Sequence, residues 1–162
     1  MSPDRRPVRR NRRTVRDVKP PRPNPDDPYR VVYFKRHPED DAEQSMPGRD
    51  FRLSLPPKVR ATMDNVLIAV AKAPPHRYSG GGYWEAMHGK MTGYHEVRVN
   101  GPSRIHYRLF CRLDVVAEDV GPLLTVLCGA SKPFRTKFDK AVYEEVLGLG
   151  QEYLSRNPRS LG

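Results

Sequence analysis

Side chains alternate between apolar and polar along one stretch of the sequence, Arg104-Ile-His-Tyr-Arg-Leu-Phe-Cys-Arg-Leu113. Successive side chains of a β-strand point to opposite faces of its sheet, so this period of two predicts a strand. The face expected in the core holds Ile105, Tyr107, Leu109, Cys111 and Leu113. The opposite face holds Arg104, His106, Arg108, Phe110 and Arg112. Such a strand is typical of a sheet with one buried face and one polar face.

Turn residues divide the rest of the chain into further elements. Residues with high β-propensity predict strands at 29–36, 83–88, 94–100, 104–114 and 123–130. Apolar spacing predicts a helix over 56–72 with Ser54 as N-cap, and a last helix after the capping sequence Thr136-x-x-Asp139. Asn100-Gly101-Pro102 is typical of a tight hairpin. This order predicts an α+β fold with a mainly antiparallel sheet packed by helices on one face.

The N-terminal residues differ in composition from the rest of the chain. Residues 1–23 hold nine Arg or Lys against Asp4 and Asp17, which is +7 of the chain's net charge of +10. We expect a disordered, basic, Pro/Arg-rich tail over 1–28, one domain over 29–157 and a short C-terminal tail over 158–162. The basic tail has three open interpretations: an arm that contacts nucleic-acid phosphates nonspecifically, a solubilising tail, or an artefact of an upstream start codon.

Several classes of protein are excluded by what the sequence lacks. It has no run of about 20 apolar residues for a membrane span, and no apolar stretch follows its basic N-terminus as in a secretory signal. Its two cysteines, Cys111 and Cys128, exclude a disulfide scaffold and a zinc site of the usual spacing, which favours a reducing cytoplasm. The run Gly80-Gly81-Gly82 lacks the ending of a P-loop and is expected to be a flexible connector. We therefore expect neither a metal nor a cofactor.

The polar face of the predicted hairpin is unusually cationic. If Val97 and Val99 are buried, Glu96 and Arg98 share the polar face of the neighbouring strand. That face would present Glu96, Arg98, Arg104, His106 and Arg108 together, and the loop after the last strand could add Lys132, Arg135 and Lys137. The plain alternative is the solvated side of a half-covered sheet. Arginine clusters suit phosphate groups, because the guanidinium fork can bind two phosphate oxygens.

Motifs from Trp84 to about Tyr153 resemble the RelE/ParE toxins of bacterial toxin-antitoxin systems. The matching pieces, in order, are Trp84-Glu-Ala-Met-His-Gly89, Gly93-Tyr-His-Glu-Val-Arg-Val99, Arg104-Ile-His-Tyr107, Leu124-Thr-Val-Leu-Cys-Gly129 and Ser131-Lys-Pro-Phe-Arg-Thr136. The resemblance implies a RelE-like fold and an endoribonuclease that cuts mRNA, often on the ribosome. The substrate's own 2′-hydroxyl would be the nucleophile, no metal would be required, and a cognate antitoxin would be the protein partner.

The resemblance also implies roles for individual residues. Glu96 and Arg98 match two working positions of the family that are often both lysine, and Arg104 matches its phosphate-binding arginine. Lys132 and Arg135 lie in its last basic segment, while Phe138 stands about where some members have a tyrosine. We expect further RNA contacts from Tyr94, Arg108 and Lys137.

Proton transfer has two candidates on the polar face. His106 is the first choice as general base because an imidazole exchanges a proton near neutrality, and Glu96 is the alternative. Two other functions stay open: a non-catalytic inhibitor of DNA gyrase like the ParE toxins, and a nucleic-acid-binding protein of the same fold without toxicity. The arginine-rich strand favours the ribonuclease over the gyrase inhibitor, whereas the basic tail favours the binding protein.

Overall fold

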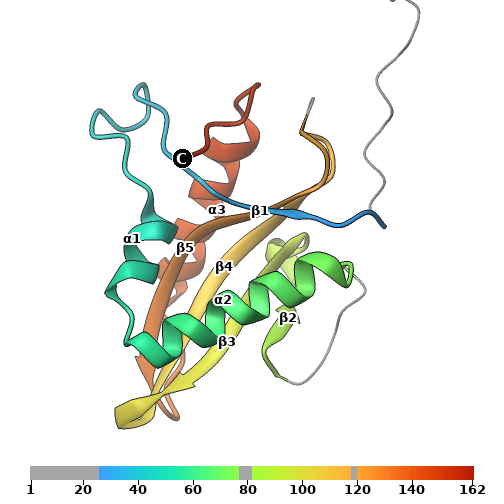
Figure 1. Ribbon diagram of the computed structural model, residues 1–162. Helices are drawn as coiled ribbons and strands as arrows, with labels where there is room; N and C mark the ends of the chain where they lie inside the picture. The colour runs from blue at the N-terminus through green and yellow to red at the C-terminus, as the bar shows by residue number, and fades with distance from the viewer. Residues whose placement is uncertain (1–25, 77–81, 118–119) are drawn as a thin grey trace, which may run out of the picture.

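The computed structural model describes residues 26–76, 82–117 and 120–162. Apart from residues 26–28, the expected tail lies outside them, as does most of the expected glycine connector. The strands are β1 (Arg30–Tyr33), β2 (Trp84–Ala86), β3 (Tyr94–Gly101), β4 (Ile105–Asp114) and β5 (Leu123–Pro133). The α-helices in these residues are α1 (Pro47–Ser54), α2 (Pro57–Lys72) and α3 (Lys140–Leu154) (Figure 1).

One five-stranded sheet in the order β1-β5-β4-β3-β2 forms the centre of this α+β fold. Strands β2 to β5 pair antiparallel with their neighbours along the chain, whereas β1 pairs parallel with β5. The sheet is therefore mixed, and the expectation of a mainly antiparallel sheet holds for three of its four pairings. Propensity identifies β1 as a strand but carries no information on the direction of its partner.

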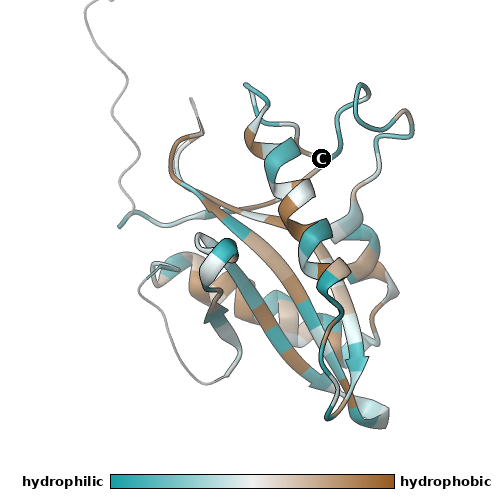
Figure 2. Cartoon of the chain, turned by 180° about the vertical axis from the view of Figure 1, so that it is seen from behind, coloured by the Kyte–Doolittle hydropathy of each residue, from teal (hydrophilic) through white to brown (hydrophobic). Residues whose placement is uncertain are grey.

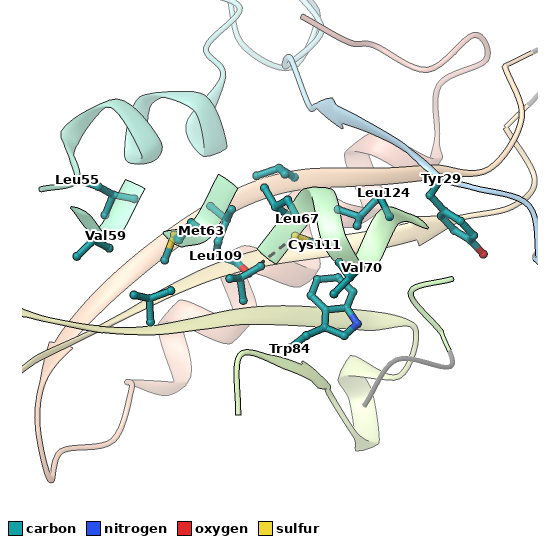
Figure 3. Packing of buried hydrophobic residues seen from close by; sticks show 14 residues of the cluster. Tyr29, Leu55, Val59, Met63, Leu67, Val70, Trp84, Leu109, Cys111 and Leu124 are labelled. Atoms are coloured by element: carbon teal, nitrogen blue, oxygen red, sulfur yellow. Dashed lines mark hydrogen bonds between the residues drawn. The ribbon is translucent and has the colours of Figure 1, made fainter. Parts of the chain in front are cut away.

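Helix α2 covers one face of the sheet. Its apolar side chains Met63, Leu67 and Val70 pack against Leu109 and Cys111 of β4, and all five are at most 2% exposed (Figure 3). Each of the Met, Leu and Val side chains contributes about 1.5–3 kcal/mol by leaving water. The predicted core face is thus confirmed at Leu109 and Cys111, and Tyr107 and Leu113 are partly buried against the same core, whereas Ile105 is half-buried outside it.

Helix α3 covers the opposite face, as the view from behind shows (Figure 2). A second core joins Val146 and Tyr153 of α3 to Phe110 of β4. Phe110 alternates with Leu109 and Cys111, so the two cores lie on opposite sides of the sheet. The expectation of helices on one face is wrong, because the face judged polar from its arginines also carries apolar residues that α3 buries.

The predictions of both helix caps need correction, and the described part of the chain has one α-helix more than predicted. The sequence patterns do not predict helix α1, and Ser54 is the last residue of this helix, not the N-cap of α2. Pro56 is the N-cap of α2, and the Ser54 hydroxyl donates to the Phe51 carbonyl oxygen. Thr136 likewise forms no capping box at α3, because its hydroxyl donates to Pro133.

The segment expected as a C-terminal tail is part of the fold. Leu161 forms an antiparallel bridge with Phe34, and the Gly162 amide donates to the Tyr33 carbonyl oxygen. Arg159 is 6% exposed at its side chain, and its Nε lies 2.8 Å from Oδ2 of the fully buried Asp114. This buried ion pair fixes the end of the chain to β4.

Candidate functional site

Charged side chains gather on the α3 side of the sheet, near the turn that joins β3 to β4. Arg98 of β3 lies opposite Arg108 of β4, and Asn100 lies opposite His106. Across the other edge of β4, His106 lies opposite Lys132 of β5. Directly opposed residues have Cβ atoms about 4.5–5.5 Å apart, so these side chains form one patch across three strands. We call the patch the basic face and define it as Glu96, Arg98, Asn100, His106, Arg108 and Lys132.

Glu96 is the carboxylate of the basic face. Its Oε1 lies 3.3 Å from Arg98 Nε, and its side chain is 15% exposed against 41% for Arg98. Burial raises the pKa of Glu96, while Arg98, Arg108 and Lys132 act in the opposite direction. Glu96 therefore compensates part of the positive charge, and Arg98 remains accessible to a ligand.

Arg108 is the buried cation of the basic face. It is 5% exposed, and its Nη1 donates to the Tyr107 carbonyl oxygen at 3.1 Å. Burial lowers the pKa of Arg108, and the neighbouring Arg98 lowers it further. Two guanidinium groups at opposed positions repel each other, and an anion between them would remove that repulsion.

His106 is half-buried and is held on two sides. Its ring stacks on Phe134 with a centroid separation of 4.1 Å, and its Nδ1 is hydrogen-bonded to Asn100 Oδ1. Desolvation lowers the pKa of His106, and Arg108, Lys132 and Arg98 lower it further. The lowered pKa favours the neutral imidazole, the form in which it can accept a proton.

Lys132 is the third cation of the basic face. Its Nζ lies 4.6 Å from the centre of the Phe138 ring. Desolvation lowers the pKa of Lys132, and so do Arg108 and Arg98, while Glu96 raises it. A lysine with a lowered pKa releases a proton more readily, so Lys132 is suited to the role of general acid.

Tyr143 is a site residue that the sequence did not reveal. It lies on α3, with its ring 6.2 Å from that of Phe110 and 6.3 Å from that of Phe138. Burial raises the pKa of Tyr143, and the nearby Glu96 raises it further. The helical pattern does not place this tyrosine beside Glu96, because it does not show that α3 covers the polar face.

Tyr94 is predicted to contact RNA, but its burial leaves too little of the side chain exposed for this role. It is 4% exposed and belongs to the core beneath α3. A Cβ on Gly150 would clash with its ring, so the helix approaches the sheet closely here. Its place on the polar face of β3 is as predicted, but α3 covers that part of the face.

The remaining predicted cations lie at the margin. The turn between β3 and β4 is the 3₁₀ segment η3 (Pro102–Arg104), with positive φ at Ser103 and Arg104. Asn100 and Gly101 are instead strand residues, so the hairpin turn lies further along the chain than predicted. Arg104, Arg135 and Lys137 are exposed, and within the described residues none of them forms an ion pair or side-chain hydrogen bond.

A polar hollow of about 460 Å³ adjoins the basic face at the edge of β3. Its wall includes Tyr83, Arg98, Asn100, His106 and Arg108. This volume lies within the range of small-ligand sites, and its chemistry is that of an anion site. The two opposed arginines and the histidine thus share one ligand-sized space.

Other chemistries have less support in the described part of the chain. Cys111 and Cys128 are buried free thiols whose pKa values are raised by desolvation, that of Cys128 to about 12. Among the described residues, no three His, Cys, Asp or Glu side chains are grouped as metal ligands.

No helix described by the structure is long and apolar enough to cross a membrane.

A scan against protein-family models, a search of curated proteins and a search of solved structures found no match for this chain. The resemblance to the RelE/ParE toxins therefore rests on the motifs quoted above.

Proposed function

We propose that this chain is an endoribonuclease that binds RNA on the basic face and cleaves it by attack of the ribose 2′-hydroxyl. The observation that carries the proposal is the opposed pair Arg98 and Arg108 with His106 beside them, an imidazole whose pKa is lowered by desolvation and by these cations. Two guanidinium groups stabilise a phosphate whose negative charge increases during attack. The RelE/ParE resemblance supports a RelE-like toxin as the protein class, mRNA as substrate and an antitoxin protein as partner.

The proposed reaction is a transesterification at phosphorus in which the two titratable groups at opposed positions on β4 and β5, His106 and Lys132, transfer the protons. His106 accepts the proton of the 2′-hydroxyl as the 2′-oxygen bonds to phosphorus. The bond from phosphorus to the 5′-oxygen breaks, and Lys132 donates a proton to this leaving group. Arg98 and Arg108 bind the non-bridging phosphate oxygens.

Glu96 has a supporting role in this mechanism. Its carboxylate is 3.3 Å from Arg98 and holds that guanidinium over the sheet. Burial raises its pKa, so it is also the alternative general base. Comparison of His106→Gln with Glu96→Gln separates these roles.

End-group analysis of the products tests the proposed reaction. The purified protein is incubated with a synthetic single-stranded RNA, and fragments are identified by mass spectrometry. We expect 2′,3′-cyclic phosphate and 5′-hydroxyl ends from the wild type and a loss of about 100-fold or more in His106→Gln. His106→Gln purified identically also controls for contaminating nucleases. Fragments with 3′-hydroxyl and 5′-phosphate ends, or equal rates for both proteins, would contradict the proposal.

A second candidate is RNA binding without cleavage. Glu96 neutralises part of the charge of Arg98, and Arg108 is buried. The basic face therefore has less positive charge to stabilise a transition state than three free cations would have, and this favours binding without cleavage. In this case Arg98→Ala would weaken RNA binding while no fragments appear with any protein. The same incubation therefore distinguishes the two functions.

A further inference from the structure

Asn100 and His106 form a cross-strand pair whose side chains are bonded to each other. They occupy directly opposed positions on β3 and β4, and Asn100 Oδ1 is hydrogen-bonded to His106 Nδ1. Phe134 stacks on the imidazole with an interplanar angle of 19°. The stack defines the plane of the ring, and the hydrogen bond defines its rotation within that plane.

This hydrogen bond determines which ring nitrogen carries the proton. An amide oxygen only accepts hydrogen bonds, so His106 Nδ1 must be the donor. A neutral imidazole has a single N–H group, and Nε2 of this ring is therefore left with a free lone pair.

Charges around the ring favour its neutral form. Arg98 faces it from β3, Arg108 from β4 and Lys132 from β5, and together with desolvation they lower the pKa of His106. No carboxylate within the described residues forms an ion pair with His106. The hydrogen bond to Asn100 and the surrounding cations thus both favour the Nδ1–H form with an unprotonated Nε2.

We propose that Asn100 is a positioning residue that holds His106 as the Nδ1–H tautomer and makes Nε2 the atom that accepts the 2′-hydroxyl proton. The second half of this statement rests on the proposed ribonuclease function. The first half concerns the free protein and does not depend on RNA cleavage.

Nitrogen NMR of the histidine ring tests the tautomer directly. The wild type, Asn100→Ala and Asn100→Asp are labelled with ¹⁵N-histidine, and the His106 signals are assigned with His106→Gln. We expect a protonated Nδ1 and an unprotonated Nε2 in the wild type at pH 7. Asn100→Ala should shift the ring towards the Nε2–H tautomer, whereas Asn100→Asp should keep Nδ1 protonated. Asn65→Ala, at another exposed asparagine, should leave the signals unchanged.

The pH profile provides the second readout. A carboxylate at position 100 raises the pKa of His106, so the acid limb of the Asn100→Asp rate profile should move to higher pH. At saturating RNA, we expect Asn100→Ala to lose about 100-fold in rate and Asn100→Asp to recover it above the new pKa.

Two results would overturn the proposal: an Nε2–H tautomer in the wild type, or an unchanged tautomer in folded Asn100→Ala. If the tautomers behave as expected but no variant cleaves RNA, the tautomer assignment stands and the ribonuclease function fails.

Discussion

Arg98 and Arg108 occupy directly opposed positions on β3 and β4, although both carry a positive charge. Opposed like charges destabilise a sheet, so the pair has an energetic cost in the free protein. Glu96 offsets part of it through its ion pair with Arg98. A bound phosphate would offset the rest, which gives the basic face a physical reason to bind anions.

Replacement of Arg98 should weaken RNA binding without unfolding the protein. Its side chain is 41% exposed, so we expect Arg98→Ala to change the free energy of unfolding by less than about 0.5 kcal/mol. RNA affinity should fall by about tenfold, and the slope of log affinity against log salt should decrease by about 0.7. Fluorescence anisotropy with a labelled RNA measures both. Arg30→Ala, at an exposed arginine on β1, is the matched control and should bind RNA like the wild type. Equal losses in the two variants would show that binding depends on overall charge.

Neutralisation of Glu96 should strengthen RNA binding. Glu96→Gln removes the carboxylate that pairs with Arg98, and the freed guanidinium becomes available to phosphate. We expect RNA affinity to rise about threefold to tenfold with cleavage retained. Titration calorimetry and single-turnover cleavage provide the two measurements. Loss of cleavage with intact binding would instead identify Glu96 as the general base.

Stability should fall in mild acid because of His95. This residue is 9% exposed, stacks on Trp84 with a centroid separation of 4.9 Å, and has its pKa lowered to about 4, mainly by burial. The unfolded chain therefore binds a proton near pH 6.5 that the folded protein does not bind until about pH 4. The contribution of His95 to the free energy of unfolding is fully present above about pH 6.5. It is lost as the pH falls, and the free energy of unfolding is lower by up to about 3 kcal/mol at pH 4.

Urea unfolding at pH 7, 5 and 4 measures this loss. His95→Gln should flatten the dependence relative to the wild type, while His88→Gln, at an exposed histidine, should not. The same slope in all three proteins would contradict the assignment to His95.

Removal of the last residues should lower the free energy of unfolding. Deletion of residues 158–162 removes Arg159 and leaves the buried Asp114 without its ion-pair partner. Breaking a buried pair in this way costs about 3–5 kcal/mol, and Arg159→Ala should have a similar effect. Arg156→Ala is the matched control, because Arg156 pairs with Glu39 and Asp40 at the surface and should matter much less. Thermal unfolding that is unchanged by the deletion would show that this segment is a dispensable tail.

Sequence patterns predict the structure best where apolar residues recur with the period of a strand or of a helix. The alternation from Ile105 to Leu113 identifies both the strand and its buried face, and the spacing of Val59, Met63 and Val70 identifies the core side of α2. Helix α1 was missed because its eight residues include Pro47, Gly48 and only two large apolar side chains.

Sequence patterns predict the surroundings of a residue less well where these depend on an element that is distant in the sequence. Tyr94 and Tyr143 illustrate this, because α3 buries the first and brings the second close enough to Glu96 for the carboxylate to raise its pKa. Nothing local to either residue specifies the path of α3 over the sheet. The bonded pair of Asn100 and His106 depends on register, which the observed turn at Ser103 and Arg104 determines.

Cleavage of a substrate with one altered sugar tests the central claim most directly. Two otherwise identical RNAs are compared under single-turnover conditions, one with ribose throughout and one with 2′-deoxyribose at the mapped cut site. We expect the wild type and Arg30→Ala to cut the first RNA at similar rates, Arg98→Ala to cut it more slowly, and none of them to cut the second at that position. Cleavage of the 2′-deoxy substrate at the same site and rate would contradict the proposed mechanism.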